Sequence, residues 1–224
     1  MSAFFKNRAL LVVATLSIGL AADIGTDILG QVAISAAVWI VLLGLLWQVE
    51  REQRFALMAC LVIATAGELF LSLVWGLYTY RLANVPLFVP PGHVMLLLLG
   101  LSLAAYLPES VALAIIGGAG VYSLAAAALG ADTLALPLFL VLGLASLAMP
   151  AQRRLYASTF VLSLALELYG TWLGNWNWAH DVPGMALVTT NPPGVAGAFY
   201  CALDALVAVS VLMLAPRLAV RAAR

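Results

Sequence analysis

Four carboxylic acids lie within apolar stretches of the sequence, where an ionisable side chain is unusual. They are Asp23, Glu68, Glu167 and Asp204. An ionisable residue inside a membrane-spanning segment costs at least about 2.5 kcal/mol, so such residues usually face the protein interior and serve a function. These four acids are therefore the first candidates for catalytic residues.

The four acids are expected to lie in one layer. Counted from the cytoplasmic end of each apolar stretch at about 1.5 Å per residue, they lie about 17–21 Å deep. No Lys or Arg lies within these stretches, and Arg81 and His93 are expected at the outer mouth. Because four buried acids cannot all be charged, we expect protonated acids that share protons, as general-acid catalysis or proton relay requires. The alternative is that each acid only joins two helices by a hydrogen bond.

Two of the acids are followed by the same series of residues. After Glu68 the chain continues with Gly76-Leu-Tyr78-Thr-Tyr80, Val85-Pro86 and Pro90-Pro91-Gly92-His93. After Glu167 it continues with Gly174-Asn-Trp176-Asn-Trp178, Val182-Pro183 and Pro192-Pro193-Gly194. The shared order predicts an internal duplication with halves 1–109 and 110–224, each of four spans in the same orientation. The alternative is that the prolines only start helices and the aromatic residues only favour the membrane interface.

Aromatic residues and a histidine cluster around both motifs. We expect this group to line the mouth of a substrate site: Trp75, Tyr78, Tyr80, His93, Trp172, Trp176 and Trp178. An aromatic belt at the membrane surface is the competing interpretation.

Motifs for metal, nucleotide and nucleophilic chemistry are missing from the sequence. It contains no Gly-x-Ser-x-Gly, Walker, Cys-x-x-Cys or His-Glu-x-x-His motif, and its only histidines are His93 and His180. We therefore predict neither a cofactor nor a metal, with a carboxylate and His93 as the only metal-site alternative. The two cysteines, Cys60 and Cys201, are expected to be small buried residues without a disulfide.

The stretch from Glu68 to Pro90 resembles the membrane carotenoid-modifying proteins, namely the carotenoid hydratases and the small integral-membrane lycopene cyclases. The hydratases carry a similar Gly-x-Tyr-x-Tyr followed by Val-Pro. In the cyclases an aromatic pair is followed by Pro and paired glutamates, whereas Pro90-Pro91-Gly92-His93 stands in that region here. The chain is also similar in size to integral-membrane meroterpenoid cyclases, which use a Glu in an early span and an Asp in a late one.

These resemblances imply a reaction that needs no cofactor. An acid protonates an alkene or epoxide of a polyprenoid, and aromatic faces stabilise the carbocation. Water then adds, or a ring closes and a carboxylate removes a proton. By position, Glu68 and Asp204 would be the proton donor and its partner, and Glu167 and Asp23 would complete the network.

The composition places these residues in a membrane protein. Hydrophobic residues make up 65% of the 224 residues and charged residues 9%, against about 45–50% and about 25% in soluble domains. This excludes a soluble globule. The formal net charge is zero, so no basic patch for nucleic acid is expected. The fold class is therefore all-α, a single polytopic membrane helical bundle.

Eight apolar segments are long enough, or nearly so, to cross a bilayer. They cover residues 9–29, 31–48, 55–78, 93–107, 111–129, 133–149, 155–174 and 194–215. With the N-terminus inside, nine basic residues face the cytoplasm and only Arg81 faces out, as the positive-inside rule requires. We therefore expect a multi-pass protein of a bacterial-type inner membrane with both termini cytoplasmic. The first segment could instead be read as a signal peptide, which would leave seven spans.

Three functional hypotheses remain open at this stage. The first is an enzyme that hydrates or cyclises a membrane lipid or isoprenoid, the second a small proton-coupled transporter or carrier, and the third a non-catalytic membrane subunit. An enzyme needs an apolar pocket that opens sideways to lipid, a carrier needs a polar path to both faces, and a subunit needs neither.

Overall fold

Residues 3–222 are described in a computed structural model, and side chains are described for residues 7–213. They form a mainly helical bundle, which confirms the all-α part of the predicted fold class. The α-helices are α1 (Ala3–Asp23), α2 (Ile28–Trp47), α3 (Arg51–Glu68), α4 (Val89–Ala104), α5 (Glu109–Ala128), α6 (Ala135–Ala148), α7 (Arg153–Leu173) and α8 (Gly197–Ala222). Each of them overlaps one of the eight predicted segments.

Helix length and composition support a membrane protein in part. Within the described residues, α2, α5 and the 24 residues of α3 with the π-helix η1 (Leu69–Val74) are long and apolar enough to cross a membrane. A fourth span results if α6 and the segment Pro150–Leu173, bent by 112° against each other, are counted together. Over their described residues, α1, α4 and α8 do not pass this test, so eight spans are not established. The prediction that Lys6, Arg217, Arg221 and Arg224 face the cytoplasm concerns residues that lie outside the described side chains.

Local sequence signals explain where helices begin and end. The side chain of Asp27 accepts a hydrogen bond from Gly30 N and so caps α2. Pro90 and Pro91 occupy the first turn of α4, where a missing N–H costs little. Gly174 ends α7 at a φ of 87°, a left-handed conformation that glycine adopts without strain.

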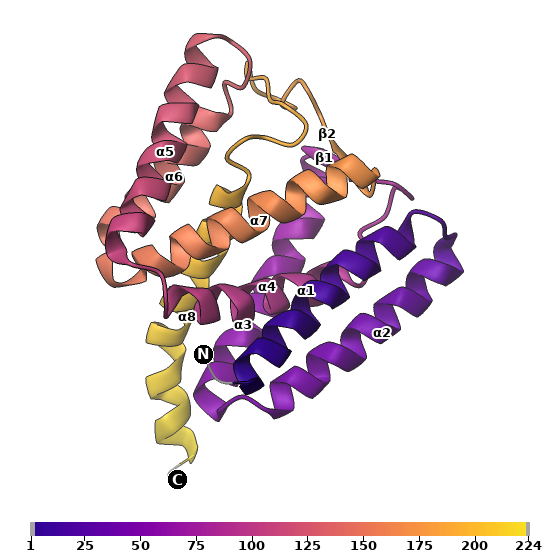
Figure 1. Cartoon of the computed structure of the whole chain (residues 1–224), viewed down its shortest axis with the longest axis vertical. Helices are drawn as coiled ribbons and strands as arrows, with labels where there is room; N and C mark the ends of the chain where they lie inside the picture. Colours follow the sequence, from indigo (N-terminus) through magenta and orange to yellow (C-terminus); the bar gives the residue numbers. More distant parts are fainter. Residues whose placement is uncertain (1–2, 223–224) are drawn as a thin grey trace.

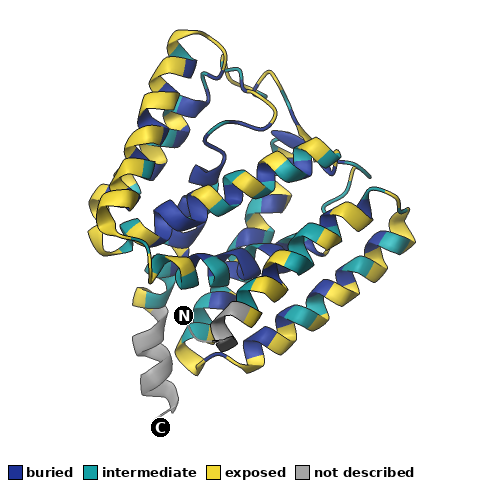
Figure 2. Cartoon of the chain, in the orientation of Figure 1, coloured by how far each residue is buried: buried dark blue, intermediate teal, exposed yellow. Residues whose placement is uncertain are grey.

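Four helices form the centre of the molecule and two pairs flank it. Helix α4 packs against α3 and α7, and α8 packs against α3 and α7. The pair α1 and α2 lies on one side and the pair α5 and α6 on the other (Figure 1). Buried residues concentrate on α4 and on the inner face of α7, whereas the outer faces of α1, α2 and α5 are largely exposed (Figure 2). An apolar outer surface over a buried centre is typical of a protein surrounded by lipid.

A short two-stranded sheet joins the two halves of the chain at one end of the bundle. Strand β1 (Tyr78–Tyr80) pairs antiparallel with β2 (Trp176–Trp178), so that Tyr78 faces Trp178 and Tyr80 faces Trp176. The strands are the Tyr-x-Tyr and Trp-x-Trp elements of the repeated motif. Nothing in the sequence indicated that these two elements pair with each other.

Candidate functional site

Glu68 is the centre of a buried hydrogen-bond cluster. It is the last residue of α3, and only 7% of its surface is exposed. The hydroxyls of Tyr78 and Tyr80 donate to its Oε2 at 2.7 and 2.6 Å. Its Oε1 lies 3.2 Å from Nε2 of His93 on α4. The π-helix that follows Glu68 is an element often found at functional sites.

The contacts of His93 place one proton between its ring and Glu68. Nδ1 of His93 lies 3.1 Å from the carbonyl oxygen of Val89. A carbonyl oxygen only accepts hydrogen bonds, so Nδ1 carries a hydrogen. Nε2 then either donates to an ionised Glu68 or accepts from a protonated one. In both arrangements a single transferable proton lies between Nε2 and Oε1.

Glu167 on α7 has the corresponding position in the second half of the chain. The indole N–H groups of Trp176 and Trp178 donate to its Oε2 at 2.7 and 3.0 Å. These donors lie 9 and 11 positions after Glu167, and the tyrosines lie 10 and 12 positions after Glu68. Each acid is therefore bound by the aromatic pair of its own motif.

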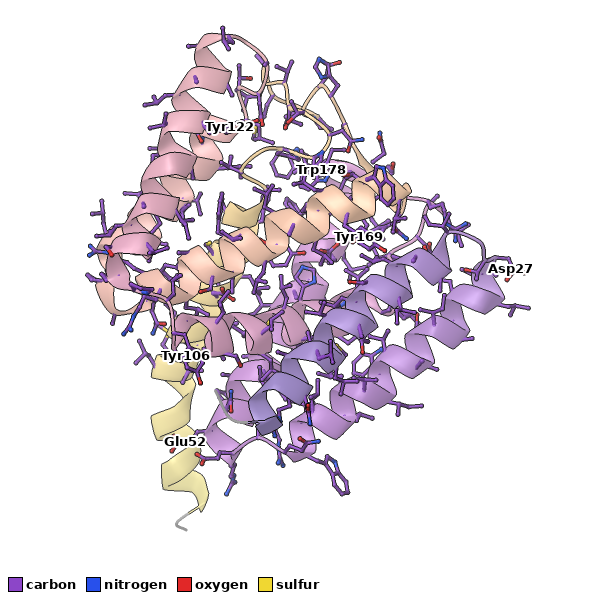
Figure 3. All side chains as sticks on the ribbon, in the orientation of Figure 1. Asp27, Glu52, Tyr106, Tyr122, Tyr169 and Trp178 are labelled. Carbon is purple, nitrogen blue, oxygen red and sulfur yellow. The ribbon has the colours of Figure 1, made fainter. Side chains whose placement is uncertain are left out.

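The strand pairing brings the two sets of aromatic residues together. Arg81 N donates to Asn175 O, and Ala179 N donates to Leu77 O. These bonds flank the strands, so Tyr78 and Trp178 form a non-hydrogen-bonded pair, in which side chains lie closest. Their ring centroids are 4.7 Å apart. Trp178 lies on the inner side of the molecule, between the sheet and α7 (Figure 3).

Two cavities share part of their lining at the cluster around Glu68 and Glu167. The first lies beside α1 and the second beside α3 and α8. Six side chains line both cavities, and we call them the central ring: Glu68, Tyr78, His93, Glu167, Trp178 and Tyr200. Tyr80 and Trp176 line only the first cavity. The rest of both linings is mostly aliphatic or aromatic, so the acids face an apolar space.

The two tyrosines of β1 remain hydrogen-bond donors over a wide pH range. Burial, and then the nearby charge of Glu68, holds the pKa of Tyr78 well above its ordinary value. The same two causes raise the pKa of Tyr80. The phenols therefore keep their protons wherever the protein is expected to work.

Asp23 belongs to a different cluster from Glu68 and Glu167. Its Oδ1 lies 3.4 Å from Nη2 of Arg81 and accepts from Gln31 at 2.9 Å, and its Oδ2 accepts from Asn175 at 3.1 Å. Nη2 of Arg81 also donates to the carbonyl oxygens of Asp23 and Thr26. The expectation that the acids have no basic partner is therefore wrong for Asp23, whose partner is Arg81. It is also wrong for Glu68, because His93 contacts that acid. This cluster fastens the segment after β1 to α1.

The remaining predicted site residues lie outside the two cavities. Asp204 on α8 is buried, and among the described residues no group makes a hydrogen bond with its Oδ2. The indole of Trp75 donates to Pro183 O at 2.8 Å. Trp172 is 78% exposed. None of these three lines either cavity.

One member of the central ring was missed by the sequence analysis. The ring of Tyr200 stacks on that of His93, with centroids 4.7 Å apart and planes inclined by 5°. Tyr200 lies four residues before Asp204 and so on the same face of α8, but this spacing does not indicate His93 as its partner.

No metal site is formed within the part of the chain whose side chains are described: no three His, Cys, Asp or Glu residues are grouped so that they could hold an ion. Comparisons with protein-family models, with curated proteins and with solved structures find no match for this chain.

Proposed function

We propose that this protein is an integral membrane enzyme that adds a proton to a carbon–carbon double bond of an isoprenoid lipid and so starts its hydration or cyclisation. The observation that carries the proposal is the 3.2 Å contact between Oε1 of Glu68 and Nε2 of His93, at the wall of two apolar cavities. A positioned proton donor in such a surrounding is what general-acid catalysis on a hydrocarbon requires.

The reaction can be balanced with the groups in the central ring. The shared proton forms a C–H bond with one alkene carbon as the π bond breaks, and a carbocation remains on the other carbon. For hydration, water adds to the cation and then returns a proton to the Glu68 and His93 pair. For cyclisation, the π bond of a second alkene breaks to form a C–C bond with the cation, which moves the positive charge to the other carbon of that alkene. A C–H bond next to that carbon then gives its proton back to the Glu68 and His93 pair, and a new double bond forms. Neither route consumes an oxidant or a reductant.

The second half of the site is suited to the cationic intermediate. Trp178 lines both cavities and presents part of its indole to them. An aromatic face stabilises a desolvated cation by about 2 kcal/mol. Glu167 adds a second carboxyl group at the same cavities. We assign proton donation to Glu68 with His93, and cation stabilisation to Trp178 with Glu167.

The shape of the cavities favours an enzyme over a carrier. The second cavity is lined by Phe70 and Leu206, which are 52% and 54% exposed on the outer surface between α3 and α8. It is thus reached from the side that lipid would cover, whereas a carrier needs a polar path to both membrane faces. The resemblance of residues 68–90 to carotenoid hydratases and lycopene cyclases supports the same class of reaction.

We further propose that all eight helices lie in a bacterial-type inner membrane, with both termini cytoplasmic and the β1–β2 sheet outside. Arg8 bonds to Gln48 at the end of α2, and Arg54 bonds to the carbonyl of Val49. Arg153 lies 3.7 Å from Glu109 at the start of α5. These basic residues therefore gather at helix ends remote from the sheet, as the positive-inside rule favours.

The direct test replaces the proposed proton donor. Membranes that contain wild-type protein or Glu68→Gln are incubated with an acyclic carotenoid in heavy water, and products are analysed by mass spectrometry. We expect a deuterium-labelled product from the wild type and none from Glu68→Gln, because the amide keeps the shape of the acid but cannot donate its proton. Glu52→Gln, at an exposed position of α3, is the control and should behave as wild type. Equal product from Glu68→Gln and wild type would refute the assignment.

A further inference from the structure

The polar cluster around Asp23 contains buried atoms that no described group of the protein satisfies. We call it the Asp23 cluster, and it consists of Asp23, Gln31, Arg81, Asn84 and Asn175. Among the described side chains, five buried polar atoms have no hydrogen-bond partner, and three of them belong to this cluster: Nε of Arg81 and Oδ1 of both Asn84 and Asn175. Buried polar atoms of this kind are usually satisfied by ordered water.

The three atoms belong to side chains that surround one carboxylate. Arg81 and Asn175 contact the carboxylate of Asp23 directly, at 3.4 and 3.1 Å. Asn84 is one hydrogen bond further away, because it donates to Gln31 and Gln31 donates to Asp23. Asn175 is only 2% exposed, so its Oδ1 does not reach bulk solvent. Water can bond both to the N–H of arginine and to amide oxygens, whereas a cation suits only the oxygens.

The Asp23 cluster lies between solvent and the first cavity. On its outer side, the side chain of Arg81 is 22% exposed. On its inner side, Nδ2 of Asn175 donates to the carbonyl oxygen of Leu20, which lines the first cavity. Tyr80 and Trp176, the chain neighbours of Arg81 and Asn175, line the same cavity. The cluster therefore closes the end of this cavity that is nearest to the sheet.

The first cavity has room and partners for water. Its volume is about 50 Å³, and a water molecule needs about 10–15 Å³ on this measure, so about three to five molecules fit. At the central ring, oxygen atoms of Tyr78, Tyr80, Glu167 and Tyr200 are available as partners beside the Glu68 and His93 pair. The second cavity opens where lipid would cover the surface, and so it does not supply water.

We propose that ordered water in the Asp23 cluster and the first cavity carries protons between the sheet end of the molecule and the Glu68 and His93 pair. Each step passes one proton from a water molecule to the next oxygen or nitrogen, and an equal number of protons leaves the pair, so nothing is oxidised or reduced. The inference takes this proton pair from the proposed function, but proton exchange at the pair can be measured without any product.

The experiment follows the ring protons of His93. His93 and His180 are the only histidines, so protein with isotope-labelled histidine gives NMR signals from two rings. In lipid bilayers we measure how fast the ring N–H protons of His93 exchange with water. We expect Asn175→Leu and Asn84→Leu each to slow this exchange by about tenfold or more, because the apolar side chain displaces water and exchange then requires local opening of the structure.

Asn177→Leu is the matched control. Asn177 lies two positions after Asn175 in the chain, but its side chain is exposed and lies outside the Asp23 cluster. This variant should exchange as the wild type does. Asn84→Leu keeps the test valid if Asn175→Leu does not fold, because Asn84 loses only one hydrogen bond, to Gln31, and an atom that has no partner. Thermal unfolding in detergent shows which variants are folded.

Two results would overturn the proton route. One is wild-type exchange at His93 in either folded variant of the Asp23 cluster. The other is equal slowing in Asn177→Leu, which would trace the effect to the sheet as a whole. Failure of the proposed function looks different: no product would form from an isoprenoid, while Asn175→Leu and Asn84→Leu would still slow exchange at His93.

Discussion

The two acids at the centre of the site are bound by chemically different partners. Glu68 contacts two phenols and an imidazole, whereas Glu167 contacts two indoles. The sequence Pro-Pro-Gly-His at Pro90–His93 corresponds to Pro-Pro-Gly-Val at Pro192–Val195. Only the first motif therefore places an imidazole against its acid. We infer that the halves share one geometry but divide the chemistry between them.

Replacement of His93 tests this division. In His93→Gln an amide can still donate a hydrogen bond to Glu68 but cannot transfer a proton. We expect product formation to fall about 10²–10⁴-fold, the usual contribution of a general acid or base. The measurement is the initial rate of deuterium-labelled product, normalised to folded protein. Glu52→Gln, at an exposed position of α3, is the control and should keep the wild-type rate. A near-normal rate in His93→Gln would remove the proton pair from the mechanism.

The tyrosines predict a particular response to alkaline pH. Their pKa values are raised in the folded state, so above the unfolded value of about 10 the unfolded chain loses these protons first. Stability from each tyrosine is thus complete below about pH 10 and falls by about 1.4 kcal/mol per pH unit above it. We expect Tyr78→Phe with Tyr80→Phe to show a shallower alkaline decline in thermal unfolding than the wild type. An identical slope in both proteins would contradict the raised pKa values.

The sequence showed which residues belong to the site, but it did not show which of them contact each other. Glu68, Glu167 and the aromatic pairs were selected because acids and Gly-x-aromatic-x-aromatic motifs recurred in one order, and the structure brings them together. The partners Arg81 and His93 were placed at the outer mouth instead. A sequence carries no measure of how far a loop folds back over the helix ends, and the segment that contains Arg81 returns to Asp23, 58 positions earlier.

At the scale of elements, close packing at one glycine allows Trp176 to reach Glu167. A Cβ atom added at Gly170 on α7 would lie closer than 3.0 Å to the indole of Trp176. The helix therefore requires glycine at this position so that the indole can cross its surface. The same helix turn receives hydrogen bonds from Gly174 N and Asn175 N at Gly170 O, which start the chain toward β2.

The substitution Gly170→Ala is expected to displace Trp176 and to lower stability by about 1–3 kcal/mol, the usual cost of overpacking. Thermal unfolding in detergent measures the loss, and a shift in tryptophan fluorescence reports the displaced indole. Gly117→Ala on α5 is the control, since a Cβ there meets nothing within 4 Å. Because alanine favours helices over glycine, the control should be neutral or stabilising. An unchanged melting temperature in Gly170→Ala would show that Trp176 has room to move aside.

The helices themselves could be located from the sequence, because long apolar runs separated by charged and proline-rich breaks leave few alternatives. The π-helix Leu69–Val74 and the pairing of β1 with β2 could not. Three-residue strands are too short for a periodic pattern, and their partner lies almost a hundred positions away. Only tertiary packing fixes such a pair.

At the scale of the whole molecule, the four central helices pack in the arrangement that the proposed duplication would give, whereas the flanking helices pack differently, α5 on α7 and α1 on α4. Helices α3 and α4 pack together as α7 and α8 do, and α3 packs on α8 as α4 packs on α7. The antiparallel pairing of β1 with β2 also relates the two motifs by an approximate two-fold rotation. That residues 1–109 superpose on 110–224 remains a prediction. It would place the proposed site on the two-fold axis, where each half contributes three side chains to the central ring.

The orientation in the membrane is the last prediction. The sheet carries Thr79 and Asn177 with exposed side chains, whereas the basic residues Arg8, Arg51 and Arg153 belong to helix ends remote from it. Loops rich in Arg stay in the cytoplasm, so the sheet should lie outside. In intact cells a membrane-impermeant thiol reagent should therefore label Asn177→Cys but not Glu52→Cys, and both should react in opened membranes. The native thiols Cys60 and Cys201 are buried and should contribute little. Labelling of Glu52→Cys in intact cells, with Asn177→Cys protected, would invert the topology and place the acid cluster near the cytoplasmic surface.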